Sequence, residues 1–209
     1  MPLSVPTTRT PLHKRQITID AFERDDGMID IEATLVDTKP FDFMLCTERP
    51  NVLAGEAVHR ILVRLTVDED AIIRETEVAM DDRPYHYCQE VETRFNLNGI
   101  KMASGFMKAV SERIGSADNC WHVQQVLPQM ATVLVQATYP AKRDRVNLMP
   151  PSERPKPPMI NTCVGWQDHR PHVRAEHGDQ DLECQPNEAS AAPLVSASAA
   201  PLTKRSPAK

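Results

Sequence analysis

The chain has 209 residues, of which 41% are hydrophobic, so it can bury one substantial core. Its C-terminal end is too polar and too rich in proline to supply a second core. The net charge of -5 provides no positive field that would attract phosphate backbones, and only 5% of the residues are aromatic, so nucleic acid is not expected as a partner.

The same sequence predicts a cytoplasmic protein that has no membrane contact. Residues 1–10 contain no apolar run of the kind that secretion requires, and no other stretch is long enough to span a bilayer. The cysteines form an odd, widely spaced set, which argues against the disulfide framework of a secreted domain. They are Cys46, Cys88, Cys120, Cys163 and Cys184. A reducing compartment fits this pattern.

Two stretches near the N-terminus predict an antiparallel β-hairpin. Residues 16–20 alternate polar and apolar side chains, and residues 29–35 do so again, with isoleucine, alanine and leucine on one face. Asp25, Asp26 and Gly27 between them are typical turn residues. We expect this half-buried pair of strands to follow a flexible leader.

A second hairpin is predicted after a long connection. Residues 37–55 contain two prolines and a glycine with little periodicity, apart from a short edge segment near residues 41–45. Residues 61–80 then alternate on both sides of an acidic turn. His59 stands just before this hairpin and Cys88 just after it.

Helical spacing replaces strand alternation after Cys88. The apolar pattern predicts a short helix over residues 89–97, a second over residues 103–114 and a third that begins near Cys120. Pro128 is expected to kink or restart the third helix. Prolines crowd beyond this helix and favour extended chain there.

The order of elements predicts an α+β fold, in which an antiparallel sheet of two hairpins packs against C-terminal helices. The core domain is expected over residues 15–140, after a flexible leader at residues 1–14. A proline-rich extension over residues 141–175 is expected to fold back on the core. Residues 176–209 are rich in alanine, serine and proline, which predicts disorder.

Three residues with ligand chemistry stand at junctions between the predicted elements. His59 opens one strand, Cys88 follows the returning strand, and Cys120 lies at the N-terminus of the last helix. The two strand ends are neighbours in an antiparallel hairpin, so the three side chains would converge if that helix end docked beside them. Thiolate and imidazole ligands suit iron, an iron–sulfur cluster or zinc. His122 is a weaker candidate ligand near Cys120.

The two cysteines and the predicted fold also allow roles that involve no metal. Free cysteine is among the most commonly buried residue types, so Cys88 and Cys120 are also consistent with simple core packing. The chain has no Cys-x-x-Cys pair, no glycine-rich phosphate loop and no His-Glu-x-x-His helix. Besides a metal-binding protein, the sequence allows an adaptor that recruits a protein partner through its long loop and extension. It also allows a metal-free, thiol-dependent enzyme. The substrate and oligomeric state are not indicated.

Several segments resemble a bacterial family, the domain of unknown function 2889 family, in which similar segments occur in this order. They are Asp26-Gly27 with Asp30 to Glu32, Leu35 to Lys39, Ala54 to His59, Pro84 to Cys88, Asn119 to His122 and Met159 to Cys163. The resemblance covers about residues 9–173. It implies no activity, because none is established for the family.

A more distant resemblance links residues 54–139 to the iron–sulfur cluster assembly scaffolds of the IscU, NifU and SufE type. In that family ligand cysteines precede a hairpin, follow it and open the last long helix, so the resemblance implies ligand roles for His59, Cys88 and Cys120. A histidine replaces the first cysteine, and an Arg-Ile pair stands where the scaffold pattern has Gly-Asp. The resemblance therefore implies a stably bound metal rather than cluster transfer, with Cys163 or His122 as a fourth ligand.

Overall fold

The structure is a computed structural model that divides into two compact units, with the boundary after Asp144. It describes residues 3–45, 51–115, 119–150, 153–157 and 159–177. Cys46 and Cys184 lie outside the described residues. The domain boundaries predicted from the sequence, including the return of the proline-rich extension onto the core, stay a prediction.

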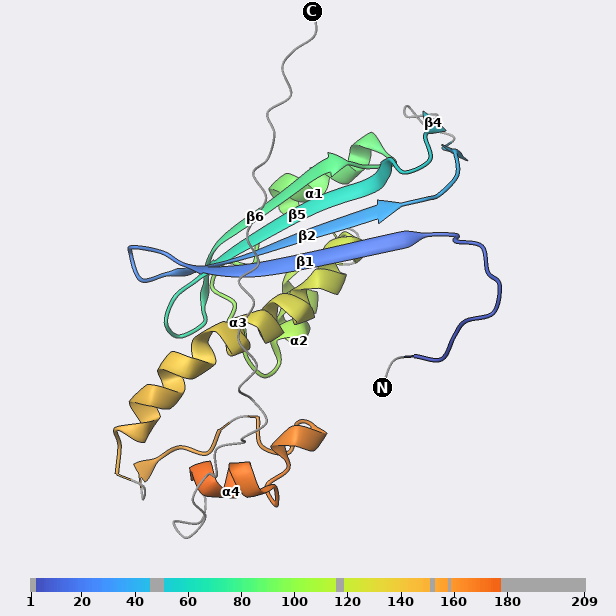
Figure 1. Ribbon diagram of the computed structural model, residues 1–209. Helices are drawn as coiled ribbons and strands as arrows, with labels where there is room; N and C mark the ends of the chain where they lie inside the picture. Colours follow the sequence, from blue (N-terminus) through green and yellow to red (C-terminus); the bar gives the residue numbers. More distant parts are fainter. Residues whose placement is uncertain (1–2, 46–50, 116–118, 151–152, 158, 178–209) are drawn as a thin grey trace, which may run out of the picture. The chain divides into compact units, whose positions relative to one another are not determined.

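The first unit contains a four-stranded antiparallel sheet in the order β1-β2-β5-β6 (Figure 1). The strands are β1 (Lys14–Glu23), β2 (Ile29–Thr38), β5 (Ala57–Val67) and β6 (Ile73–Asp82). Gly27 has a φ of 81° in the first turn, which a residue without a β-carbon adopts easily. Both predicted hairpins are confirmed. The connection between them contains the small hairpin of β3 (Phe43–Met44) and β4 (Asn51–Val52), close to the predicted edge segment.

Helices follow the sheet, as predicted, but their bounds differ. In the first unit they are the short 3-10 helix η1 (His86–Gln89), α1 (Glu90–Arg94), α2 (Phe106–Arg113) and α3 (Trp121–Asn147), whose last three residues follow the boundary after Asp144. The second unit contains η4 (Val164–Trp166) and α4 (Pro171–His177). Gly105, with a φ of 84°, delays the start of α2 relative to the predicted helix. None of the helices in the described part of the chain is long and apolar enough to cross a membrane.

One expectation about α3 is wrong: the helix continues through Pro140 to Asn147 where extended chain was predicted. The helix also runs through Pro128 without a break, so of the predicted kink or restart at Pro128 the restart is excluded. Pro128 removes one backbone donor, but Val126, Leu127 and Met130 around it are buried in the core, and this packing outweighs the lost hydrogen bond. After Pro140, alanine, lysine and arginine are good helix formers that extend the helix.

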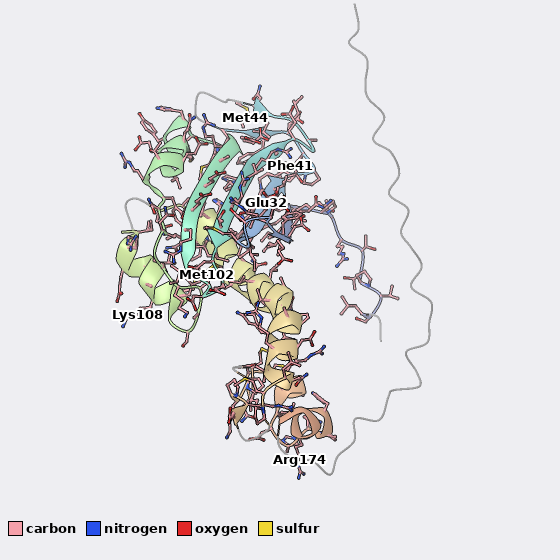
Figure 2. The ribbon with its side chains drawn as sticks, turned by 90° about the vertical axis from the view of Figure 1, so that its left-hand side faces the viewer. Glu32, Phe41, Met44, Met102, Lys108 and Arg174 are labelled. Atoms are coloured by element: carbon pink, nitrogen blue, oxygen red, sulfur yellow. The ribbon has the colours of Figure 1, made fainter. Side chains whose placement is uncertain are left out.

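One face of the sheet packs against α3 and buries the core. The buried side chains come from every second position of β2 and β5 and from the apolar stripe of α3. They include Ile31, Ala33, Leu35, Ile61, Val63, Leu65, Val123, Val126, Leu127 and Met130. The opposite face is charged: Arg64 lies 3.7 Å from Glu32, which Figure 2 labels, and 2.6 Å from Glu77. Positions that share the alternation of the buried face therefore point toward α3.

Candidate metal centre

The helix-facing side of the sheet changes from apolar to polar at one end. Ile17, Leu35 and Ile61 form a cross-strand row on β1, β2 and β5. Two residues away along each strand, the next row on the same face consists of Arg15, Asp37 and His59, which the register pairs across the three strands. The strand alternation that builds the core thus also places a carboxylate beside an imidazole under α3.

Asp37 is the centre of this polar row and is 1% exposed. Arg15 donates from Nε to Oδ1 and from Nη2 to Oδ2, both at 2.7 Å, and His13 Nε2 lies 3.1 Å from Oδ1. Arg15 also donates from Nη1 to the Gln125 side chain of α3 at 2.6 Å, so the guanidinium joins β1 to the helix. Burial alone would raise the pKa of Asp37, but the hydrogen bonds and charge of Arg15 outweigh it and lower the pKa. The carboxylate is therefore ionised.

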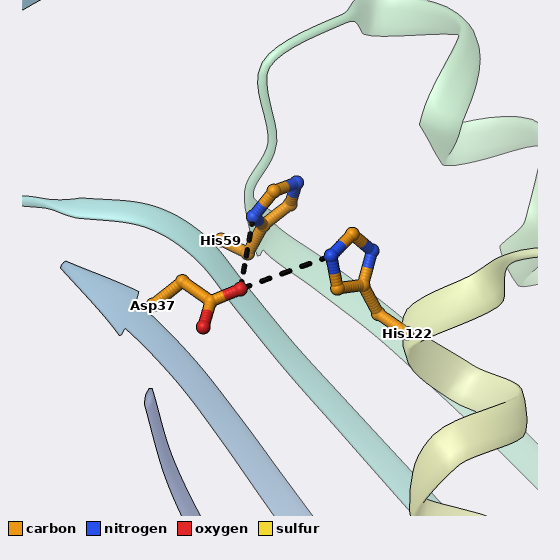
Figure 3. Close-up of side chains that lie close together, drawn as sticks. All are labelled: Asp37, His59 and His122. Carbon is orange, nitrogen blue, oxygen red and sulfur yellow. Dashed lines mark ion pairs between the residues drawn. The ribbon is translucent and has the colours of Figure 1, made fainter. Parts of the chain in front are cut away.

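Two imidazoles converge on the same carboxylate oxygen, as Figure 3 shows. His59 Nδ1 lies 3.2 Å from Asp37 Oδ2, and His122 Nε2, from the first turn of α3, lies 3.8 Å from it. The centroids of the two rings are 4.1 Å apart. One ligand atom from each of the three residues can be chosen so that all three atoms lie within 4.8 Å of one another. This spacing is compatible with a common metal ion.

Both imidazoles are held in the neutral form that binds metals. Burial, followed by the neighbouring His122, lowers the pKa of His59 to about 4. Burial, followed by the charge of Arg15, also lowers the pKa of His122. His59 Nδ1 is buried and has no hydrogen-bond partner among the described residues, although it faces Asp37. A neutral imidazole with an unshared nitrogen is a ready ligand.

The structure places the predicted cysteines beside this group but not within it. Cys88 and Cys120 are half-buried, and both line one pocket beside the start of α3. Cys120 Sγ lies 3.8 Å from His122 Nδ1. Burial is the main cause that raises the pKa of the Cys88 thiol. Cys163 is exposed and belongs to the second unit. Within the described residues, the group of potential metal ligands that lie close together consists of Asp37, His59 and His122 and includes no cysteine. The predicted set of His59, Cys88 and Cys120 stays a prediction.

Asp37 and Arg15 are the residues that the sequence reasoning missed. The predicted strand was ended at Leu35, although its alternation continues for two more positions to Asp37. An acidic residue whose position in the strand alternation places it on the buried apolar face indicates a candidate site, because a buried charge requires a partner. Extending the first strand backward in the same way reaches Arg15.

Comparison with known proteins identifies a family. A family model described as "Protein of unknown function (DUF2889)" matches residues 13–136, more than half of the chain, so the chain belongs to this family. The matched region contains Asp37, His59 and His122. No curated protein and no solved structure gives a significant match. The resemblance to this family seen in the sequence is confirmed over residues 13–136, whereas its extension to about residue 173 and the likeness to iron–sulfur scaffolds stay predictions.

Proposed function

We propose that this protein, as a member of the DUF2889 family, binds a divalent transition-metal ion through Asp37, His59 and His122. The observation that carries the proposal is the buried His59 Nδ1, which has no hydrogen-bond partner among the described residues and lies 3.2 Å from the buried carboxylate of Asp37. Two such atoms repel through their lone pairs when no proton lies between them. A cation that accepts both lone pairs removes this repulsion.

The distances support a compact mononuclear centre. Zinc–ligand bonds of about 2.0–2.1 Å at tetrahedral angles give ligand atoms that are about 3.3 Å apart. The His59–Asp37 and His122–Asp37 distances of 3.2 and 3.8 Å lie close to that value, so small side-chain movements complete the site. Three protein ligands leave a coordination position for water or a substrate, as in catalytic zinc centres.

The donor set favours a single ion over a cluster. Two imidazoles and one carboxylate suit zinc or iron(II), whereas an iron–sulfur cluster requires several cysteine thiolates. Cys120 Sγ lies 3.8 Å from His122 Nδ1, the ring nitrogen other than the one that faces Asp37. We therefore take zinc and iron(II) as the candidate ions and use zinc as the probe.

Arg15 supports the proposed centre by orienting one ligand. Its two hydrogen bonds fix the plane of the Asp37 carboxylate, which is the function that outer partners of metal ligands commonly have. Its positive charge also lies beside Oδ2 and opposes a second cation there. Arg15 therefore limits zinc affinity while it positions the carboxylate.

Zinc binding to the apo-protein, measured by competition with a coloured chelator, tests the proposal. We expect one tightly bound ion per chain, and an affinity at least about tenfold weaker in His59→Ala and in His122→Ala. His169→Ala is the matched control, because this imidazole is 65% exposed and lies in the second unit. Equal binding by the wild-type protein and both ligand variants would contradict the proposal.

The ligand set predicted from the sequence is a separate proposal that the same assay distinguishes. If His59, Cys88 and Cys120 hold the ion, Cys88→Ser should weaken zinc binding as strongly as His59→Ala, and Asp37→Asn should have little direct effect. If Asp37, His59 and His122 hold it, Asp37→Asn should weaken binding and Cys88→Ser should not.

A further inference from the structure

The two edges of the four-stranded sheet differ in how their backbone groups are satisfied. At the β6 edge, the segment that follows the strand supplies partners: Met80 donates its N–H to Glu92 Oε1 at 2.8 Å, and Ile73 donates its N–H to the Ile100 carbonyl at 2.9 Å. β1 forms the opposite edge, as Figure 1 shows. Among the described residues, none outside β2 forms a hydrogen bond with the backbone of β1. One row of peptide groups on β1 is therefore open.

The β1 strand also lacks the features with which edge strands usually avoid pairing. It has 10 residues, pairs with β2 along its whole length without a bulge, and contains no proline. From Gln16 to Phe22 its single charged residue is Asp20, which pairs with Glu32 on the charged face of the sheet and not on the buried face. A long edge of this kind is a template for another strand.

We propose that β1 pairs antiparallel with β1 of a second copy of this chain, so that the two sheets join into one. The two-fold axis of this dimer passes through Ile19, where the strand meets itself. Residues that lie opposite each other in antiparallel strands point to the same face, so the buried faces of both sheets stay on one side.

The order of side chains along β1 favours a second copy as the partner. On the face toward α3 the strand begins with a base and ends with an acid, and the residues in order are Arg15, Ile17, Ile19, Ala21 and Glu23. A copy reversed about Ile19 places Arg15 opposite Glu23, and two-fold symmetry forms this pair twice. It also places Ile17 opposite Ala21. Every pair on this face is therefore either apolar or oppositely charged.

The burial of β1 supports the same partner. Ile17 and Ile19 are only partly buried, whereas Leu35 and Ala33, which lie opposite them on β2, are 1% and 2% exposed. A strand on the open side of β1 gives the two isoleucines apolar neighbours on both sides. Glu23 forms no ion pair with a described residue, so its carboxylate is available to the partner copy.

Sedimentation velocity of the full chain tests the proposal. At about 100 μM, where an interface of micromolar affinity is saturated, we expect a species of twice the 23.5 kDa mass of one chain. Glu23→Arg turns both attractive pairs into repulsive ones and should weaken the dimer at least about tenfold. Glu69→Arg is the matched control, because it makes the same charge change at an exposed position in the turn between β5 and β6, and it should dimerise as the wild-type protein does. Runs with a chelator and with zinc separate this result from the metal proposal.

Amide hydrogen exchange, followed by nuclear magnetic resonance, gives a second measurement that needs no variant. The amides of β1 that do not bond to β2 should exchange more slowly at high than at low protein concentration, whereas exchange in β6 should not depend on concentration. A monomer at about 100 μM, equal dimer affinities of the wild-type protein and Glu23→Arg, or exchange in β1 that is independent of concentration would overturn the proposal.

Discussion

Replacing Asp37 with asparagine should destabilise the apo-protein strongly, because the carboxylate is the buried centre of a charged network. Asp37 is 1% exposed and accepts two hydrogen bonds of 2.7 Å from Arg15. Asparagine preserves the volume but removes the charge and at least one of these interactions. Removing one partner of a buried pair costs about 3–5 kcal/mol, and we expect about 3 kcal/mol here because Arg15 is 31% exposed and regains some hydration.

Urea denaturation followed by circular dichroism, with a chelator present, measures this free energy of unfolding. At about 2–4 °C per kcal/mol for a unit of this size, the melting temperature should fall by about 6–12 °C. Glu77→Gln is the matched control, because it also breaks a carboxylate–arginine pair on the same sheet. That pair lies on the solvent face, with Glu77 60% exposed, and should contribute at most about 1 kcal/mol. Similar losses in Asp37→Asn and Glu77→Gln would refute the reasoning.

Three further predictions concern the same network. The free energy of unfolding should decrease as the pH falls from about 6.5 to about 4, because unfolded His59 takes up a proton in this window and folded His59 does not. The contribution of His59 to this decrease is at most about 3 kcal/mol. A His59→Asn variant whose stability has the same pH slope would contradict this prediction. Arg15→Met should destabilise the apo-protein by about 2–3 kcal/mol but increase the stabilisation by zinc in thermal melts. The zinc effect increases because the ion is then the only partner that compensates the charge of Asp37. An unchanged zinc effect would argue against a carboxylate that both Arg15 and the ion contact. The double variant Arg15→Met with Asp37→Leu should recover part of the stability lost in Asp37→Asn yet bind zinc at least about tenfold more weakly than the wild-type protein. Wild-type zinc affinity in this variant would exclude Asp37 as a ligand.

The sheet could be predicted because its strands alternate regularly. Ile31, Ala33 and Leu35 mark one face of β2, and Ile61, Val63 and Leu65 mark the matching face of β5. Turn residues fix the ends of the hairpins. These are local signals, and each one depends on residues that are close in the sequence.

The helical region was harder to predict, because packing decides where the helices end. Pro128 and Pro140 are local signals for interruption, yet both lie inside α3. The apolar side chains near Pro128 are buried in the core, and the favourable free energy of this burial cannot be predicted from the proline itself.

The candidate centre was predicted only in part. His59 and His122 were identified as chemistry-bearing residues, but their common partner Asp37 comes from a strand on which no site residue was expected. Pairing between β2 and β5 brings Asp37 opposite His59, and this register depends on residues that are distant in the sequence. Cys120 Sγ lies 3.8 Å from His122 Nδ1, and its ligand role beside His59 stays a prediction.

X-ray absorption at the zinc edge of the one-to-one complex tests the central claim most directly, because it reports the ligand atoms themselves. The account predicts a shell of nitrogen and oxygen atoms at about 2.0–2.1 Å, with the outer scattering of two imidazole rings and no sulfur. His122→Ala should lose the signal of one ring. A sulfur neighbour at about 2.3 Å would contradict the Asp37, His59 and His122 centre and would favour ligation by Cys88 or Cys120.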